Sequence, residues 1–431
     1  MKHWLQQLCH FATPSIDECV QQLGPVIPWL NDLRKTPQDP GWHAEGNVHI
    51  HTGMVLEELY QLLATEAAYL NGQQRQALIL AAIFHDIGKT RNTRKMTIRG
   101  QQRIGSPDHE AKGRSYLAFQ LMKLPLTITV IWTVLGLVGE HQMPKMLVVQ
   151  NMDHGAYIAL SRRADLALLY WLERADMQGR MGEAIPHQLR CLEQYRQHSE
   201  AYGLWHQPFS TDELDRLIAH ESQSAQRYLK SLVVESMQRG TCVSAKNVIA
   251  KLSHHKDEHA HLILLCGPSG IGKSRYVARH CQNMSVVSLD AIREELWGDR
   301  TCQDNPELVV ATAQQKLKQY LREKHNVVWD ATNLRQDYRK PLYAMARDQH
   351  ALITLVIFLA PETAIYSGNA NRTHAVPKAV VAAQIAKYQF PRISDVHHVI
   401  AVDGEGHILF ESNGNIVTLE PIVTLRPNCM L

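Results

Sequence analysis

Apolar residues recur with a helical period through the first part of the chain. The segment HTGMVLEELYQLL places His51, Val55 and Leu59 on one face, four residues apart. The segments QALILAAIFHD and DLALLYWLERAD carry the same kind of apolar face, and each ends in an aspartate. A polar side chain that ends a buried face points toward the core, where it needs a partner. The pattern predicts a helical region from about residue 45 to 185, with polar groups turned into its interior.

After residue 260 the pattern changes, and short β-rich runs alternate with helical segments such as ELVVATAQQKLKQYL. This alternation predicts a parallel sheet covered by helices. In the tail, VIAVDGEGHILF has two strand-like runs around Asp-Gly-Glu-Gly and predicts a hairpin. The four apolar runs of the predicted sheet are LILLC (262–266), SVVSL (285–289), NVVWD (326–330) and LITLVIFL (352–359).

These patterns divide the chain into unlike parts. The stretch KLSHHKDEHAH (251–261) is polar and charged, which is typical of a domain boundary. The predicted fold is multidomain: an N-terminal all-α domain is followed by an α/β domain with a parallel sheet. We expect a helical domain over 1–190 with its core at about 45–185, a helical connector over 191–258, the α/β domain over 259–400 and a hairpin-like tail over 401–431.

Composition supports an ordinary globular chain. The 431 residues suggest about three units of ~150 residues, or two domains plus a connector. Apolar residues make up 45% and charged residues 20%, which excludes a disordered or fibrous chain. The net charge is only +3, so any nucleic-acid contact must be local to a site. Histidine is unusually frequent, with 24 copies, and imidazole is a common metal ligand and acid–base group.

Cysteine use and the apolar stretches bear on location. The eight cysteines form no CxxC pair, which excludes a zinc ribbon and a thioredoxin motif and fits a reducing compartment. The N-terminus has no secretory pattern. The longest uncharged apolar stretch, 124–139, is shorter than the ~18 residues of a membrane span. We therefore expect a cytoplasmic protein without a membrane partner.

A glycine-rich octapeptide, GPSGIGKS, follows the run LILLC and opens a helical segment. It matches GxxxxGK[ST], whose backbone N–H groups wrap a polyphosphate while the lysine reaches the β- and γ-phosphates. The serine hydroxyl of such a loop binds Mg²⁺. A glycine-rich turn without a ligand is the weaker alternative. The motif predicts a site for ATP, or another nucleoside triphosphate, with Mg²⁺, formed by Gly267, Ser269, Gly270, Gly272, Lys273 and Ser274.

Residues after the next strands could serve the phosphate acceptor. The run SLDAIREE carries Asp290 and Arg293 in D-x-x-R spacing. Because the carboxyl ends of strands border the ligand crevice, Asp290 could take a proton from an acceptor hydroxyl and Arg293 could grip an acceptor phosphate. A helix-start aspartate with a solvated arginine is an equal alternative. Further along, WDATN carries Asp330, and Arg372 precedes a helix that could close as a lid.

The phosphate loop, D-x-x-R, DATN and the lid arginine together resemble the 5′-OH polynucleotide kinases of phages and bacteria, over about residues 261–400. The resemblance implies that Lys273 binds ATP and that Asp290 is the general base. It implies that Arg293 binds the phosphate next to the acceptor 5′-OH and that Arg372 is the lid arginine on the donor. Because small-molecule kinases share the phosphate loop, the loop alone does not identify the acceptor. D-x-x-R together with DATN favours a polynucleotide acceptor.

Histidines and aspartates recur at the ends or on the apolar faces of successive predicted helices. They stand in HTGMV, AAIFHDIGKT, SPDHEAKGRS, GEHQMPK and ERADMQGR. Nitrogen and carboxylate ligands on separate helices are how a metal site is built in a helical core. One such histidine is usually an ordinary core or surface residue, but burying this many without a shared ligand is costly. The constellation is His51, His85, Asp86, His109, His141 and Asp176.

This region resembles the HD phosphohydrolase superfamily, and most closely the HD domain of bacterial CCA-adding tRNA nucleotidyltransferases, through HT, HDxGK, HExxGR, H and ADxxGR. The resemblance implies that all six residues of the constellation are metal ligands. Six ligands suit two divalent transition metals, such as Mn, Ni or Co, better than a minimal four would. The implied mechanism is attack of a metal-bound hydroxide on a phosphate ester.

Two positions have competing candidates. His49 lies close to His51, which is preferred because it precedes Thr as in the family pattern. Asp165 is the alternative to Asp176, which is preferred because ADMQGR matches the family and shares a face with apolar residues.

Basic residues around this constellation could bind the substrate. Lys89, Arg114 and Arg180 stand beside predicted ligands and could hold its phosphate, although solvated side chains are about as plausible. The basic run over 91–103 could steer an RNA backbone, or it could be a solvated loop.

The pair of motif sets resembles the bacterial HD–Pnk type of end-healing enzyme. That resemblance implies removal of 2′,3′-cyclic phosphate and 2′-phosphate ends by the first domain and phosphorylation of 5′-OH ends by the second. RNA or DNA ends and ATP are then the substrates, and a separate ligase seals the break because no KxDG motif is present.

Three alternatives stay open. The first is a nucleotide phosphohydrolase joined to a small-molecule kinase. The second is a P-loop that regulates the hydrolase without transferring phosphate. The third is an RNA-binding scaffold without turnover.

Overall fold

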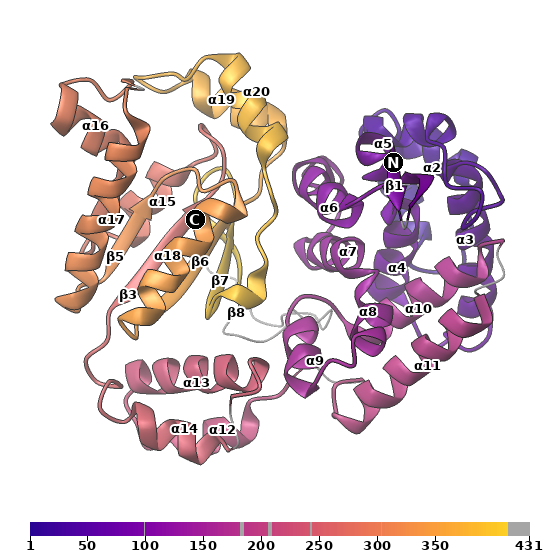
Figure 1. The fold of residues 1–431 in the computed structure, drawn as a ribbon. Coiled ribbons are helices and arrows are strands. Elements are labelled where there is room, and N and C mark those ends of the chain that lie inside the picture. The colour runs from indigo at the N-terminus through magenta and orange to yellow at the C-terminus, as the bar shows by residue number, and fades with distance from the viewer. Residues whose placement is uncertain (99, 182–184, 206–208, 242–243, 303, 413–431) are drawn as a thin grey trace.

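The computed structural model describes residues 1–412 except 99, 182–184, 206–208, 242–243 and 303 (Figure 1). A mostly helical body is followed by connecting helices and then by a sheet covered with helices, which confirms the predicted fold class. The helices of the first body are α1 (Lys2–Gln7), α2 (Ile16–Leu23), η1 (Pro28–Lys35), α3 (Val48–Ala64), α4 (Gly72–Phe84), α5 (Lys89–Asn92), α6 (His109–Gln120), η2 (Leu121–Lys123), α7 (Ile128–Glu140), α8 (Met143–Val149), α9 (His154–Ser161), α10 (Leu166–Gln178) and α11 (Ile185–Ala201).

Helix α4 forms the centre of the first body, and α3, α7 and α10 pack against it. Residues 75–84 are all buried, as expected for a helix that is apolar on nearly every side. Side-chain caps fix where two of the surrounding helices begin. Asn47 accepts the N–H of Ile50 before α3, and Asp165 accepts the N–H of Leu168 before α10.

An antiparallel hairpin, β1 (Arg94–Ile98) and β2 (Gln101–Gly105), interrupts the helical body. The expectation of an all-helical domain missed it, and most of the basic run 91–103 is strand rather than loop. Gly100 turns the hairpin with a φ of 78°. Five-residue strands rich in basic residues give little local periodicity, so their pairing rather than their composition defines them.

The chain after α11 is also helical, with α12 (Asp212–Ile218), α13 (Gln223–Gln238) and α14 (Ala245–Leu252), and the boundary that we placed after residue 190 falls inside α11. Helix α13 joins the connector to the sheet domain. Ser231 on this helix hydrogen-bonds Nε2 of His398 at 2.9 Å. Gln238 donates from Nε2 to the carbonyl oxygen of Ser394 at 2.7 Å.

The sheet of the last domain has the strand order β4-β5-β3-β6-β7-β8. Neighbours are parallel except for β8, which is antiparallel to β7. The central strand β6 is buried at every residue, because helices cover both faces of the sheet. The elements are β3 (His261–Cys266), α15 (Lys273–His280), β4 (Ser285–Ser288), α16 (Leu289–Trp297), α17 (Pro306–Arg322), β5 (Val327–Asp330), α18 (Gln336–Asp348), β6 (Leu352–Phe358), α19 (Glu362–Ala370), α20 (Lys378–Lys387), η3 (Ile393–Asp395), β7 (His398–Val402) and β8 (Ile408–Ser412).

The hairpin predicted in the tail is present as β7 and β8. It does not stand apart from the sheet, because β7 pairs in parallel with β6. The boundary that we placed after residue 400 therefore falls inside β7. The rest of the predicted tail, 413–431, lies outside the described residues.

The helical body and the sheet domain share a buried aromatic contact. The Trp132 ring lies 5.6 Å from the Phe390 ring and 4.4 Å from the Phe410 ring, measured between centroids. The N–H of Phe390 donates to Oγ of Ser115 at 2.9 Å. Interdigitated rings and a buried hydrogen bond hold the two bodies in one relative position.

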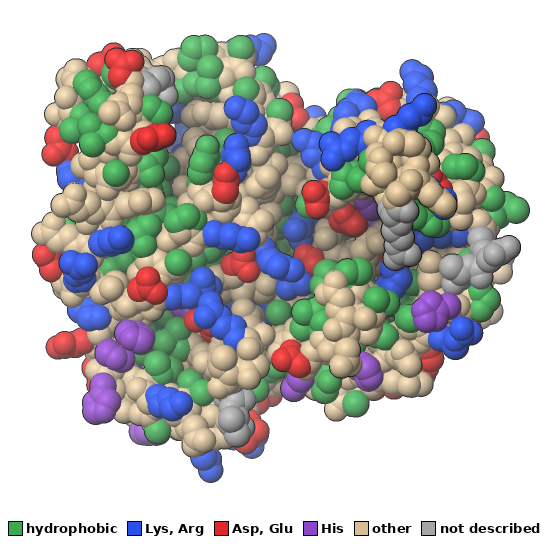
Figure 2. Space-filling model, in the orientation of Figure 1, with side chains coloured by type: hydrophobic (Ala, Val, Ile, Leu, Met, Phe, Trp, Pro, Cys, Tyr) green, Lys and Arg blue, Asp and Glu red, His purple; other side chains and the backbone are tan. Residues whose placement is uncertain are grey.

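A cleft of about 470 Å³ also opens between the two bodies. Figure 2 shows lysine and arginine side chains gathered near the junction on this face. The cations that line the cleft include Arg239, Lys340, Arg347 and Arg392. Within the described part of the chain, no helix has the length and apolar character to cross a membrane.

Candidate functional site

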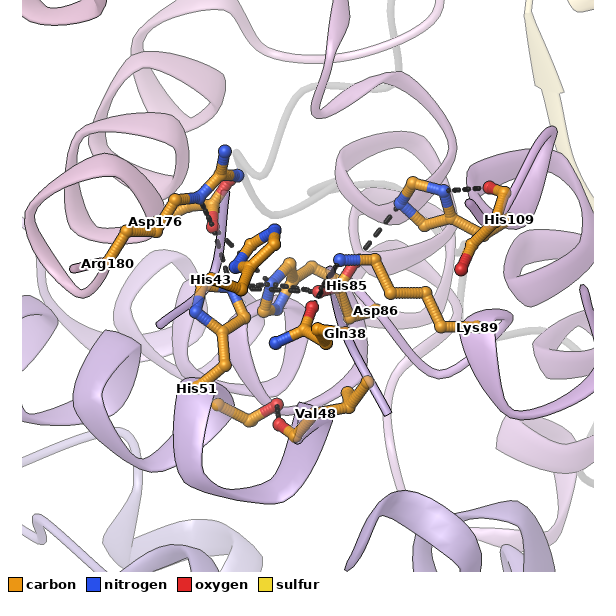
Figure 3. A network of polar contacts seen from close by, with 12 residues as sticks. Gln38, His43, Val48, His51, His85, Asp86, Lys89, His109, Asp176 and Arg180 are labelled. Carbon is orange, nitrogen blue, oxygen red and sulfur yellow. Dashed lines mark hydrogen bonds and ion pairs between the residues drawn. The ribbon is translucent and has the colours of Figure 1, made fainter. Parts of the chain in front are cut away.

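The six residues of the predicted constellation lie together in the core of the helical body. Figure 3 labels all of them except His141. Each is nearly inaccessible to solvent. They come from different elements, which approach because α3, α7 and α10 pack against α4 and α6 packs against α7. His51 lies in α3, His85 and Asp86 follow α4, His109 begins α6, His141 follows α7, and Asp176 lies in α10.

Asp86 stands between two groups of histidines. On one side, His51, His85 and Asp86 offer ligand atoms that all lie within 4.8 Å of one another. On the other side, Asp86, His109 and His141 do the same. Nε2 of His109 lies 3.1 Å from Oδ1 of Asp86, and Nε2 of His51 lies 3.6 Å from its Oδ2. One carboxylate thus contributes to two adjacent sets of possible metal ligands.

Asp176 adds a second carboxylate to the first group, because its Oδ1 lies 2.9 Å from Nε2 of His51. The two competing candidates are placed elsewhere. His49 contacts Asp17 at 2.9 Å, and Asp165 caps α10.

The imidazoles are held so that Nε2 faces the cluster. Nδ1 of His85, His109 and His141 each bonds a backbone carbonyl three residues earlier, at 2.8–2.9 Å. Nδ1 of His51 instead faces Oε1 of Glu45 at 3.1 Å. A histidine that donates from Nδ1 to a carbonyl presents the Nε2 lone pair, which is the usual arrangement around a bound metal.

Electrostatics favour the metal-binding form of Asp86 and His141, whereas at His85 the Asp86 carboxylate outweighs the effect of burial and raises the pKa of the imidazole. Burial opposes ionisation of Asp86, but Lys89 and His85 outweigh it and hold the pKa of that carboxyl well below its usual range. Burial together with the charges of His109 and His85 lowers the pKa of His141 to about 3. At neutral pH the cluster therefore combines carboxylates with a neutral imidazole, as metal binding requires.

The donor set fits divalent metal ions. Nε2 of His141 is buried, and it has no hydrogen-bond partner among the described residues. Orphaned buried nitrogens are costly, and a metal ion satisfies them. Imidazole and carboxylate ligands suit divalent transition metals such as Mn, Ni or Co.

The HDxGK motif allows α6 to approach the cluster. A Cβ on Gly88 would lie 2.0 Å from the carbonyl oxygen of His109. Only glycine fits here, so the close turn after Asp86 brings His109 within reach of that carboxylate.

A cleft of about 350 Å³ leads to the cluster and is lined by His43 and His109. Two of the predicted substrate-binding residues, Lys89 and Arg180, line it, and Lys145 adds a third cation. Lys89 lies 2.6 Å from Oδ2 of Asp86, and Arg180 pairs with Asp176, so both cations sit beside predicted ligands.

Arg114 lies elsewhere. It pairs with Glu140 at 2.7 Å and stacks over Phe390, which places it at the contact between the two bodies.

Sequence analysis missed the residues that support the cluster. Glu45 accepts from Nδ1 of His43 at 2.8 Å as well as facing His51. Gln38 accepts from Lys89 at 2.7 Å. These residues precede α3 in a segment without periodicity, and only the alternation of histidine and glutamate around 43–51 could have drawn attention to it.

The second site is the phosphate loop between β3 and α15. Gly270 and Gly272 have φ values of 85° and 106°, which other residues rarely adopt. A Cβ on Gly270 would lie 2.5 Å from the carbonyl oxygen of Ile365, and one on Gly272 would lie 2.5 Å from that of Gly404. The loop is thus enclosed by α19 and by the turn between β7 and β8, and α15 begins at Lys273.

The loop lysine is buried and crosses the loop. Nζ of Lys273 donates to the carbonyl oxygens of Gly267 and Pro268 at 3.0 and 2.9 Å. Burial lowers the pKa of Lys273 to about 8, although Asp330 opposes this shift. Burial also raises the pKa of Asp330. These two groups are the charged centre of the site.

Asp290 and Arg293 form an ion pair at 2.6 Å. The Asp290 side chain is 53% exposed, so a large acceptor has access to it. Arg372 is exposed just after α19, and its charge acts on both Lys273 and Asp330. The predicted acceptor and lid residues therefore lie around one site.

Two further residues join this site to its surroundings. Asn333, from the DATN run, donates to the carbonyl oxygen of Leu265 at 2.6 Å and ties β5 to the strand before the loop. Gln384 on α20 accepts the N–H of Ser269 at 2.8 Å, which joins α20 to the loop.

Comparison with known proteins agrees with this second site. A family model described as an AAA domain matches residues 262–391. The match spans the phosphate loop, the D-x-x-R and DATN runs and helices α19 and α20. A search of curated proteins finds no match to the chain. Residues 262–391 are thus a P-loop, kinase-like nucleotide-binding domain, and the helical body contains a candidate metal site.

Proposed function

We propose that the protein is a bifunctional nucleic-acid end-healing enzyme. The helical half removes 2′,3′-cyclic phosphate and 2′-phosphate ends in a metal-dependent reaction, and the P-loop half phosphorylates 5′-OH ends with ATP. The observation that carries the proposal is the Asp86 carboxylate shared by two histidine groups below a cation-lined cleft, in one chain with a kinase-like phosphate loop.

The two activities are complementary. RNA cleavage by attack of a 2′-OH leaves a cyclic phosphate on one side of the break and a 5′-OH on the other. An enzyme with both sites would prepare both ends for a separate ligase. We place this repair reaction in the cytoplasm.

In the helical half, the cluster holds the ions and the cleft holds the phosphate ester. Metal ions bound there supply Lewis-acid stabilisation of negative charge and lower the pKa of water. Lys89 and Arg180 are positioned beside Asp86 and Asp176, so they can bind the oxygens of a phosphate held at the cluster. Lys145 adds positive charge at the wall of the cleft.

In the P-loop half, Asp290 takes the proton of the 5′-OH. The hydroxyl oxygen bonds to the γ-phosphorus of ATP as the bond from that phosphorus to the β-phosphate oxygen breaks, which releases ADP. Arg293 binds the phosphate next to that hydroxyl. Lys273 and Arg372 stabilise the charge on the donor phosphates, and Ser274 contributes to Mg²⁺ binding.

The test uses an RNA oligonucleotide with a 5′-OH and a 2′,3′-cyclic phosphate, incubated with ATP, Mg²⁺ and Mn²⁺. Mass spectrometry follows both ends in the wild type, in Lys273→Ala and in Asp86→Ala. We expect Lys273→Ala to lose only phosphorylation of the 5′-OH and Asp86→Ala to lose only removal of the 2′,3′-cyclic phosphate. Unchanged RNA ends in the wild type would reject the repair function and redirect the search to nucleotides and small alcohols.

A further inference from the structure

An exposed indole lines the cleft above the metal ligands. Trp42 lines this cleft and is 46% exposed. The chain has eight tryptophans, all within the described residues, and Trp42 is the only one of them that is exposed. The guanidinium carbon of Arg103 lies 5.2 Å from the centroid of its ring. Arginine over indole is a favourable cation–π contact, and it covers one face of the ring.

This surface is held in place by the residues behind it. Nη1 of Arg103 donates to Oδ1 of Asp39 at 2.8 Å. The same carboxylate accepts the N–H groups of Gly41 and Ile104, each at 3.0 Å. A Cβ on Gly41 would lie 2.3 Å from the Arg103 guanidinium, so the loop before Trp42 fits closely around it. The β1–β2 hairpin therefore orients Arg103 and, through it, the indole.

The same cleft has a polar and cationic lining. Lys89, Lys145 and Arg180 line it, and Lys89 and Arg180 pair with the candidate ligands Asp86 and Asp176. Nε2 of Gln38, which also lines the cleft, is buried and has no hydrogen-bond partner among the described residues. An unpartnered amide donor beside three cations is suited to phosphate oxygens. The volume of about 350 Å³ lies in the range of roughly 300–1,000 Å³ of small-molecule sites.

We propose that Trp42 and Arg103 form a stacking site for a nucleobase, namely the base of the nucleotide whose phosphate lies at the metal ligands. The inference rests on the proposed phosphoesterase function and specifies its substrate class. A phosphate beside the metal ligands and an aromatic surface lining the same cleft match a nucleotide, whereas a small phosphate ester has nothing to place against the indole. Stacking tolerates every base, so the site selects nucleotides without reading their sequence.

The test compares two phosphate monoesters that differ in having a base. Every variant is a full chain that also carries Lys273→Ala, so that nucleotide binding at the phosphate loop does not contribute to the measurement. Phosphate release from 2′-AMP and from glycerol 2-phosphate is measured with Mn²⁺. The proteins compared are the chain with Trp42 intact, Trp42→Ala and Trp42→Phe. Phe11→Ala is the matched control, because Phe11 is an exposed aromatic residue (93%) outside the cleft.

We expect Trp42→Ala to raise KM for 2′-AMP about tenfold or more, since stacking is worth roughly 5- to 150-fold per base. KM for glycerol 2-phosphate should not change, and Trp42→Phe should restore most of the loss. Equal effects on both substrates, or no effect on either, would overturn the stacking site while leaving the phosphoesterase function intact.

A binding measurement separates failure of the stacking site from failure of the hydrolase. Calorimetry compares 2′-AMP with inorganic phosphate on the metal-free protein. Preferential binding of 2′-AMP that Trp42→Ala abolishes supports the base site even if no phosphate is released. Equal affinity for both ligands in every variant overturns it.

Discussion

Nε2 of His109 lies 3.1 Å from Oδ1 of Asp86, although the two residues are more than twenty positions apart in the chain and a β-hairpin separates them. Through this contact Asp86 belongs to the group with His141 as well as to the group with His51. Substitutions in one group should therefore have different consequences from substitutions at the shared carboxylate.

The metal content should report this difference. We expect two Mn²⁺ or similar ions per wild-type chain, about one for His141→Ala, and fewer than one for Asp86→Ala, because Asp86 serves both groups. Elemental analysis after dialysis measures the ratio. His49→Ala is the control, since His49 is buried on α3 but contacts Asp17. Equal losses from His141→Ala and Asp86→Ala would contradict two separable sites.

The affinity for ATP should fall as the pH rises through about 8. Burial lowers the pKa of Lys273 to about 8, so the free protein loses the ammonium above that pH, while bound phosphates favour the charged form. We expect a decline approaching tenfold per pH unit above 8, measured by equilibrium titration. Lys273→Arg stays protonated, so its affinity should show no such decline. A constant wild-type affinity from pH 7 to 10 would exclude this titration.

Asp290→Asn should abolish phosphoryl transfer without weakening ATP binding. General-base catalysis contributes about 10²- to 10⁴-fold, and Asp290 pairs with Arg293 rather than with the loop. We expect kcat to drop by that factor while Kd for ATP stays within about twofold. Asp337→Asn is the matched control, because Asp337 is another exposed acid in a first helical turn, paired with Arg335. A similar loss in the control would assign the effect to helix stability.

Trp132→Ala should weaken the contact between the two bodies. Trp132 is buried against Phe390 and Phe410, and truncating a buried tryptophan costs about 3–5 kcal/mol. We expect lower thermal stability and two resolved unfolding transitions where the wild type shows one. Calorimetry distinguishes this outcome from a single transition that merely shifts, which would mean that the bodies unfold together without the ring contact.

Local patterns in the sequence predicted many elements of this fold. The helical period around His51, the glycine-rich loop before Lys273 and the alternation of apolar runs with helices predicted the helical body, the P-loop and the parallel sheet. Such features depend on residues close together in the chain, where side-chain periodicity and backbone conformation act directly.

Tertiary structure decided what the local pattern could not. The pairing of β1 with β2, of β7 with β6, and of Arg103 with Asp39 joins segments whose separate sequences carry no sign of each other. The six candidate ligands were recognised by type, but their division into two groups around Asp86 follows from how α3, α7 and α10 pack against α4 and α6 packs against α7. Packing brings together residues that are distant in the chain, and only the folded chain shows which of them meet.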